Sequence, residues 1–134
     1  MSFLPSTQDG YLPYFLLFTV FLGFTHAIIS YISAPDVATG QFRGPRAPPP
    51  TSLLAHVYGM KNFYTVLIRG YAAYHLDNKE LYALTMWTFV GVLWLYVTEF
   101  VVWKTASFKN AMIPYLMAGT GLVWMWNQRE WYAR

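Results

Sequence analysis

The chain has 134 residues, of which 56% are hydrophobic and 11% are charged, and its formal net charge is +3. A chain of this length forms one domain. The sequence has no cysteine, which excludes disulfides, thiol catalysis and cysteine-ligated metals, and its positive charges are spread over loops and the C-terminus, which argues against a nucleic-acid partner.

Four long apolar stretches follow one another along the chain, at approximately 11–33, 53–76, 81–103 and 111–127. Because a helix rises about 1.5 Å per residue, about 20 residues cross a hydrocarbon core of about 30 Å. The stretches predict an all-α fold, in which residues 1–134 form a single integral membrane domain, a four-helix transmembrane bundle. The first stretch is longer than the apolar core of a signal peptide, so we expect it to be a retained span.

The connections predict how the helices follow one another. Residues 34–52 contain the run Gly-Pro-Arg-Ala-Pro-Pro-Pro at 44–50, which is incompatible with a helix and typical of an extended or polyproline-like chain. Thr51 or Ser52 is a suitable N-cap for the helix that follows. The other loops are short, and Asp-Asn-Lys at 77–79 is typical of a turn, so we expect a tight antiparallel hairpin between the second and third helices.

Small and polar side chains recur at spacings of three and four along the first stretch. They are Thr19, Gly23, His26, Ser30 and Ser33. Gly23 and Ala27 form a small-xxx-small pair, as Ala55 and Gly59 do in the second stretch, and such pairs allow helix backbones to approach closely. The favoured interpretation is that this face of the first helix packs inward. The alternative is a ligand channel along it.

The charged residues inside the apolar stretches are Lys61, Arg69 and Glu99. Lys61 lies beside a polar face of the second helix, which consists of Tyr58, Asn62, Thr65 and Arg69. Because an unpaired charge in mid-membrane is costly, we expect Glu99 to form a buried pair with Lys61. Arg69 and His56 are the less favoured partners. The structural interpretation is that the pair fixes the register of two helices, and the functional one is a proton-transfer or ligand-anchoring site.

The residues indicate no catalytic, cofactor-binding or metal site. The remaining candidate ligands are His26, His56 and His75. His26 and His56 would be offset by about one turn if the first two helices are antiparallel, which does not suit a bis-histidine haem. The sequence has no Ser-His-Asp set, glycine-rich phosphate loop or paired catalytic carboxylates. We therefore expect a protein that is not an enzyme and that binds no metal or cofactor.

The C-terminal end of the chain resembles a known family. The run Leu-Val-Trp-Met-Trp-Asn-Gln-Arg-Glu-Trp-Tyr at 122–132 resembles the signature of the Erg28 family, the ergosterol biosynthetic protein 28 group. Further blocks that agree are Gly-Tyr-Leu-Pro at 10–13, Ile-Arg at 68–69 and Asn-Lys-Glu-Leu-Tyr at 78–82. The chain departs from the family pattern in two places: Thr-Glu at 98–99 stands where the family has Ser-Glu, and the proline-rich run at 44–50 replaces a more charged stretch.

The resemblance implies a non-enzymatic, multi-pass protein of the endoplasmic reticulum membrane that acts as a scaffold in sterol biosynthesis. The partners that it implies are the sterol C-4 demethylation enzymes: the sterol C-4 methyl oxidase, the decarboxylating sterol C-3 dehydrogenase and the 3-keto sterol reductase. The sterol C-24 methyltransferase is a further partner of the family, and membrane lipid surrounds the helices. A scaffold of this kind raises the effective concentration of each enzyme for the next.

The tail is the candidate partner-binding segment. It consists of Gln128, Arg129, Glu130, Trp131 and Tyr132. Arg and Trp are enriched at interface hot spots, which favours binding. The alternative is that Trp131 and Tyr132 only anchor the chain at the membrane interface.

Two other functions are compatible with the residues. One is a sterol-binding membrane enzyme similar to the sterol isomerases, which also use small helix bundles with buried carboxylates and histidines. Its candidate residues would be Glu99, His26 and Trp94. The other is a chaperone that only retains one enzyme in the membrane.

Overall fold

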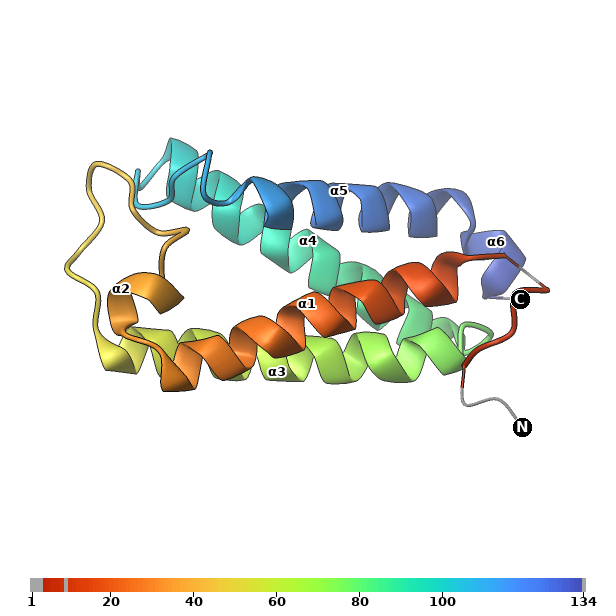
Figure 1. Cartoon of the computed structure of the whole chain (residues 1–134). Helices are drawn as coiled ribbons and strands as arrows, with labels where there is room; N and C mark the ends of the chain where they lie inside the picture. The colour runs from red at the N-terminus through yellow and green to blue at the C-terminus, as the bar shows by residue number, and fades with distance from the viewer. Residues whose placement is uncertain (1–3, 9, 134) are drawn as a thin grey trace.

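The computed structural model describes residues 4–8 and 10–133, and over these residues the protein is all-helical (Figure 1). The helices are α1 (Leu12–Ile32), α2 (Pro35–Ala38), α3 (Ser52–Tyr74), α4 (Lys79–Val101), α5 (Met112–Asn127) and α6 (Arg129–Tyr132). Each predicted apolar stretch holds one of the four long helices. The two short helices, α2 in the first connection and α6 in the tail, were not predicted.

Local sequence signals explain where the long helices begin. Pro13 stands in the first turn of α1, where its missing N–H is not needed. The Thr51 hydroxyl accepts a hydrogen bond from the backbone N–H of Leu54 at 3.1 Å, which confirms Thr51 as the N-cap of α3. Asn78 caps α4 in the same way, because its side-chain oxygen accepts from the N–H of Leu81 at 2.9 Å.

Two of the helices, α1 and α4, are long and apolar enough to cross a membrane. Large apolar side chains are exposed along the outward faces of all four long helices. Examples are Phe21 on α1, Tyr64 on α3, Trp94 on α4 and Val123 on α5, each at least 60% exposed. The polar residues of the same helices lie mostly inside, as Thr19, Asn62 and Thr85 do. This is the reverse of the pattern of a soluble protein.

The long helices pack mainly in two pairs. In Figure 1, α1 lies along α3, and α4 lies along α5. The connection between α3 and α4 is short, as the 77–79 turn indicates, yet α3 contacts α1 far more extensively than it contacts α4. The structure therefore confirms the all-α fold and has a dominant α1–α3 pair, whereas the predicted tight hairpin between α3 and α4 is not confirmed.

Small residues bring α1 and α3 together. A Cβ added at Gly59 would lie 2.9 Å from the Cβ of Ser30 and 3.3 Å from the carbonyl oxygen of Ala27. A Cβ at Gly23 would lie 2.5 Å from Cγ1 of Val66. These contacts confirm that the small and polar face of α1 packs inward.

The main apolar core lies between the two helix pairs, toward the end of the bundle where the described chain termini lie. It contains Leu12, Leu16, Ala72, Ala73, Leu76, Tyr82, Phe89, Ala118, Met125 and Tyr132. Phe89 is fully buried, and its ring packs directly against Gly121 of α5. The α4–α5 contact therefore depends on a residue without a side chain.

We expect Gly121→Ala to lower the free energy of unfolding by about 1–3 kcal/mol, because overpacked cores lose about that much. The added Cβ would lie 2.6 Å from the fully buried Phe89 ring. Gly91→Ala on α4 is the matched control, since nothing lies within 4 Å of a Cβ there. Thermal unfolding in detergent measures both variants. Equal melting temperatures would contradict this packing.

Candidate functional site

A cavity of about 300 Å³ lies between α1, α3, α4 and α5. Its polar lining residues are Thr19, His26, Gln41, Tyr58, Lys61, Asn62, Arg69, Tyr96 and Asn110. Three of these, Tyr58, Asn62 and Arg69, belong to the polar face that the sequence predicts on α3. The fourth member of that face, Thr65, instead donates its hydroxyl to the carbonyl oxygen of Lys61 in its own helix at 2.8 Å.

His26 joins α1 to α3 on the cavity wall. The side-chain nitrogen of Asn62 lies 3.2 Å from Nδ1 of His26. When the amide donates, Nδ1 is the acceptor and carries no proton. The Ser30 hydroxyl donates to the carbonyl oxygen of His26 at 2.8 Å, and the His26 ring meets the Tyr58 ring edge to face at 5.3 Å between centroids. The histidine is thus held by polar and aromatic contacts from both helices.

A pair of tyrosines closes one side of the cavity. The hydroxyls of Tyr58 on α3 and Tyr96 on α4 form a hydrogen bond. Tyr115 of α5 donates its hydroxyl to the carbonyl oxygen of Tyr96 at 2.7 Å. The Phe42 ring stacks on Tyr96 with centroids 5.5 Å apart. These contacts link α3, α4, α5 and the first connection at one point.

The two interior cations contact aromatic rings. Nζ of Lys61 lies 4.6 Å from the centroid of the Tyr58 ring. The guanidinium carbon of Arg69 lies 4.0 Å from the centroid of the Phe89 ring, and its Nε donates to the Thr88 hydroxyl at 3.0 Å. Arg69 is 8% exposed. Cation–π contacts are favourable, but they do not neutralise the charge.

The structure does not bring Glu99 together with Lys61, Arg69 or His56. Over residues 4–8 and 10–133 the salt bridge is the exposed one between Arg43 and Asp36. Glu99 lies in the last turn of α4, where its carbonyl oxygen accepts from the N–H of Thr105 at 2.7 Å, and its Oε2 is buried without a hydrogen-bond partner. The expected pairing assumed that α3 and α4 lie side by side throughout, whereas α3 packs mainly on α1.

The other predicted candidates lie apart from the cavity. His56 stacks on Tyr31 with ring centroids 4.4 Å apart, and His75 is exposed at the end of α3. Trp94 is 71% exposed on the outer face of α4. Of the residues suggested for an enzyme, His26 alone lines the cavity, while Glu99 and Trp94 do not. In the part of the chain that the structure describes, no cluster of three or more His, Asp or Glu residues suits a metal ion.

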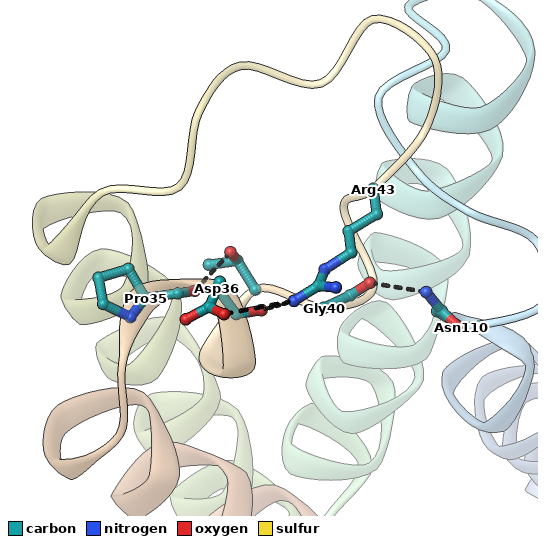
Figure 2. A network of polar contacts seen from close by, with 6 residues as sticks. Pro35, Asp36, Gly40, Arg43 and Asn110 are labelled. Carbon is teal, nitrogen blue, oxygen red and sulfur yellow. Dashed lines mark hydrogen bonds and ion pairs between the residues drawn. The ribbon is translucent and has the colours of Figure 1, made fainter.

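The first connection covers one end of the bundle (Figure 2). The Arg43 guanidinium forms an ion pair with the Asp36 carboxylate and donates a hydrogen bond to the backbone carbonyl oxygen of Asp36. The side-chain amide of Asn110 donates to the carbonyl oxygen of Gly40 at 3.0 Å. The backbone N–H of Gly44 donates to the carbonyl oxygen of Thr105 at 2.8 Å. These bonds fix the connection against the α4–α5 loop, with Gln41 and Phe42 turned toward the bundle interior.

The tail forms the short helix α6 at the opposite end. The guanidinium carbon of Arg129 lies 3.8 Å from the centroid of the Trp126 ring, and Trp124 donates its indole N–H to Oε1 of Gln128 at 2.8 Å. Tyr132 is buried in the core, whereas Trp131 is 50% exposed. The five candidate partner-binding residues therefore divide into packed and exposed ones, and Glu130 belongs to the exposed set.

Comparison with known proteins settles the family. The family model described as "Erg28 like protein" matches residues 12–123. The chain belongs to the Erg28 family. It is 31% identical to ergosterol biosynthetic protein 28 of Candida albicans, over 98% of this chain and 94% of that protein. It is 30% identical to the Saccharomyces cerevisiae protein of the same name, over 96% of this chain and 87% of that one.

A plant relative extends the comparison. The Arabidopsis thaliana protein of the same name is 32% identical over 54% of this chain and 59% of its own length. No solved structure matches this Erg28-family chain. Erg28-family proteins take part in ergosterol biosynthesis, as the names of the relatives state.

Three polar residues of the cavity lining could not be singled out from the sequence: Gln41, Tyr96 and Asn110. Gln41 and Asn110 lie in connections, where no helical period indicates which way a side chain points. Tyr96 belongs to an aromatic-rich helix in which most of the other aromatic residues face outward. The one sequence signal that Tyr96 faces the interior is the polar Thr98 nearby, and this signal is weak.

We expect Asn62→Leu to lower the free energy of unfolding by about 1–3 kcal/mol, because it removes the hydrogen-bond donor to the half-buried His26 ring. Thr65→Val is the matched control on the same helix, since the Thr65 hydroxyl bonds only within α3. Melting temperatures in one detergent measure the two variants. A loss in Thr65→Val as large as in Asn62→Leu would contradict the role of the Asn62–His26 contact.

Proposed function

We propose that this protein is a multi-pass membrane scaffold that tethers the sterol C-4 demethylation enzymes in the endoplasmic reticulum. Membership of the Erg28 family supports a role in sterol biosynthesis. The partners we propose are the C-4 methyl oxidase, the decarboxylating C-3 dehydrogenase and the 3-keto reductase, with the C-24 methyltransferase as a further one. The observation that carries the proposal is an apolar groove with a charged rim beside the tail.

That groove has a volume of about 580 Å³ and lies between α4, α5 and α6. Its apolar lining includes Trp87 and Trp126, which are 67% and 55% exposed. Lys79, Arg129 and Glu130 line it as well. An apolar centre with aromatic residues and charges at the edge is the usual composition of a protein interface. The groove thus extends the candidate tail surface onto the outer face of α4.

The membrane topology we propose has four spans, α1, α3, α4 and α5, within one domain of residues 1–134. The outward apolar faces of all four helices support it, because lipid is the surrounding that such faces require. Both described ends of the chain lie with the α3–α4 turn at one end of the bundle, opposite α2 and the α4–α5 loop (Figure 1). Four membrane crossings would place both chain ends and the α3–α4 turn on one side of the membrane, and α2 with the α4–α5 loop on the other.

A labelling experiment tests the four spans. The chain lacks cysteine, so single cysteines can be introduced at Asp77 and Lys109, which are both exposed. In sealed microsomes, a membrane-impermeant thiol reagent should label one of the two variants and should reach the other only after permeabilisation. Labelling of both variants from the same side would exclude the proposed topology.

A pull-down tests the scaffold. We expect the double variant Glu130→Lys, Trp131→Ala to stay in the membrane and to recover several-fold less of the demethylation enzymes after purification in mild detergent. Glu130 lines the groove and Trp131 follows it in the tail, and Trp87→Ala is a second variant in the groove lining. Trp103→Ala is the matched control, because Trp103 is 61% exposed and follows α4 at the opposite end of the bundle.

The proteins that co-purify are identified by mass spectrometry, at equal levels of the tagged chain. Unchanged recovery with both groove variants would leave the tail as a membrane anchor and would move the partner surface to another face. Loss of the same enzymes with Trp103→Ala would show that the effect is not specific to the groove.

One observation favours a second candidate function, a sterol-binding enzyme. His26 lies in a cavity with two cations and two tyrosine hydroxyls. Turnover of a sterol by the purified chain alone, and its loss in His26→Ala, would establish that function in place of the scaffold.

A further inference from the structure

The cavity between α1, α3, α4 and α5 has a positively charged wall. Lys61 and Arg69 both line it, and no Asp or Glu is among its described lining residues. Neither cation lies within 4.0 Å of a carboxylate in the described parts of the chain. Charged side chains inside a membrane protein are normally paired, because an isolated charge there is costly. The partner that the fold does not supply is an anion.

Lys61 is the cation that is available to a ligand. Its ammonium group has three hydrogen-bond donors. Within the described structure it forms no side-chain hydrogen bond or salt bridge and lies against the Tyr58 ring. Arg69 is held more firmly, by the Thr88 hydroxyl and the Phe89 ring. We therefore assign direct contact with the anion to Lys61, while Arg69 raises the positive potential of the wall.

The rest of the cavity suits an apolar body. Its apolar lining residues include Leu22, Val92, Met117 and Ala118. Ile113, which is 64% exposed, and exposed Asn110 belong to the same lining, so the cavity opens to the outside at the start of α5. A volume of about 300 Å³ is at the lower limit for a ligand pocket and encloses the polar end of a ligand with part of its body.

The depth of Lys61 selects the kind of anion. Lys61 is nine residues beyond the start of α3 at Ser52, which is about 14 Å along the helix axis. That depth is well inside a hydrocarbon core of about 30 Å. A carboxylic acid can enter the bilayer in its neutral, protonated form and ionise beside Lys61, whereas the phosphate of a phospholipid stays charged and remains at the membrane surface. The connection with Gln41 and Phe42 also covers the end of the bundle that is nearer to the surface.

We propose that this cavity binds the carboxylate end of an apolar acid from the membrane, with Nζ of Lys61 contacting the carboxylate. Sterol carboxylic acids and long-chain fatty acids share this chemistry. The choice of a sterol acid rests on the proposed function, whereas the recognition of an apolar carboxylate rests on the cavity alone.

The experiment measures binding to the purified full chain in a neutral detergent, by titration of tryptophan fluorescence and by thermal shift. The probes are a 4-carboxysterol, the matching neutral 4-methylsterol, oleic acid, oleyl alcohol and phosphatidic acid. We expect each acid to bind at least tenfold more tightly than its neutral counterpart. Preference for the 4-carboxysterol over oleic acid would identify a sterol acid as the ligand, and equal affinity would support a general site for apolar acids.

Two variants separate the charge from the shape of the cavity. Lys61→Met should weaken binding of the acids at least tenfold while it melts at or above the wild-type temperature without ligand, because it removes an unpaired interior charge. Ile113→Trp should also weaken binding, since it fills the exposed opening without touching the core. Lys104→Met, an exposed cation after the end of α4 that lines neither the cavity nor the groove, should bind as the wild type does.

Unchanged affinity in Lys61→Met, equal binding of the neutral probes, or tighter binding of phosphatidic acid than of either acid would overturn the proposal. The outcome is independent of the scaffold experiment, because binding is read on the purified chain and enzyme recovery is read on groove variants far from Lys61. A chain that recovers the enzymes but binds no acid would refute the cavity ligand and leave the scaffold standing.

Discussion

The close contact between α1 and α3 is the constraint on which the rest of the structure depends. In the four-span topology proposed above, α1 and α3 lie in lipid and gain nothing from burying apolar surface against each other, so their association requires close backbone packing and polar contacts. Gly59 provides the packing, because its missing side chain admits Ser30 and the backbone at Ala27. His26 and Asn62 provide the polar contact one turn further along.

The α1–α3 contact also determines where the cavity lies. With α3 turned toward α1, its polar face points to the interior between the helix pairs, and Lys61 and Arg69 are carried with it. Glu99 is not carried along, since it belongs to the other pair and to the last turn of α4. Two cations therefore share an interior wall, while the partly buried carboxylate of Glu99 remains near the α4–α5 loop.

Close backbone contacts, together with the packing of Phe42, close the end of the bundle beside the cavity. Gly44 approaches the α4–α5 loop so closely that an added Cβ would lie within 2.9 Å of backbone atoms of Thr105 and Ala106. The loop itself turns at Lys104, which has a positive φ of 58°. Both features hold the first connection over the cavity, so that Phe42 reaches Tyr96. A proline-rich connection of irregular structure is thereby fixed by its hydrogen bonds to a second loop.

The sequence was sufficient for the parts of the fold that follow from helical periodicity. The four long helices, the Thr51 cap and the inward face of α1 could all be predicted, because each depends on neighbours within one helix. That Glu99 does not pair with Lys61 could not be predicted in this way, since it depends on which helices pack together. Turn length favoured α3 with α4, but the small residues at Gly23 and Gly59 favoured α1 with α3, and the small residues decided the packing.

The cavity and the groove lie toward opposite ends of the bundle, which has a consequence for a scaffold. The groove is bordered by Arg129 and Glu130 beside the tail, whereas the cavity is bordered by Gln41 and Asn110 beside the connections. A partner in the groove would therefore not cover the opening at Ile113. If the chain tethers enzymes as proposed, an acid produced by one of them is more soluble in water than its neutral precursor, so it leaves the membrane more readily. A cationic site within the scaffold would oppose that loss where a pair of enzymes alone would not. It must also release the acid to the next enzyme, which favours modest affinity and is consistent with a small, open cavity and a single flexible ammonium group.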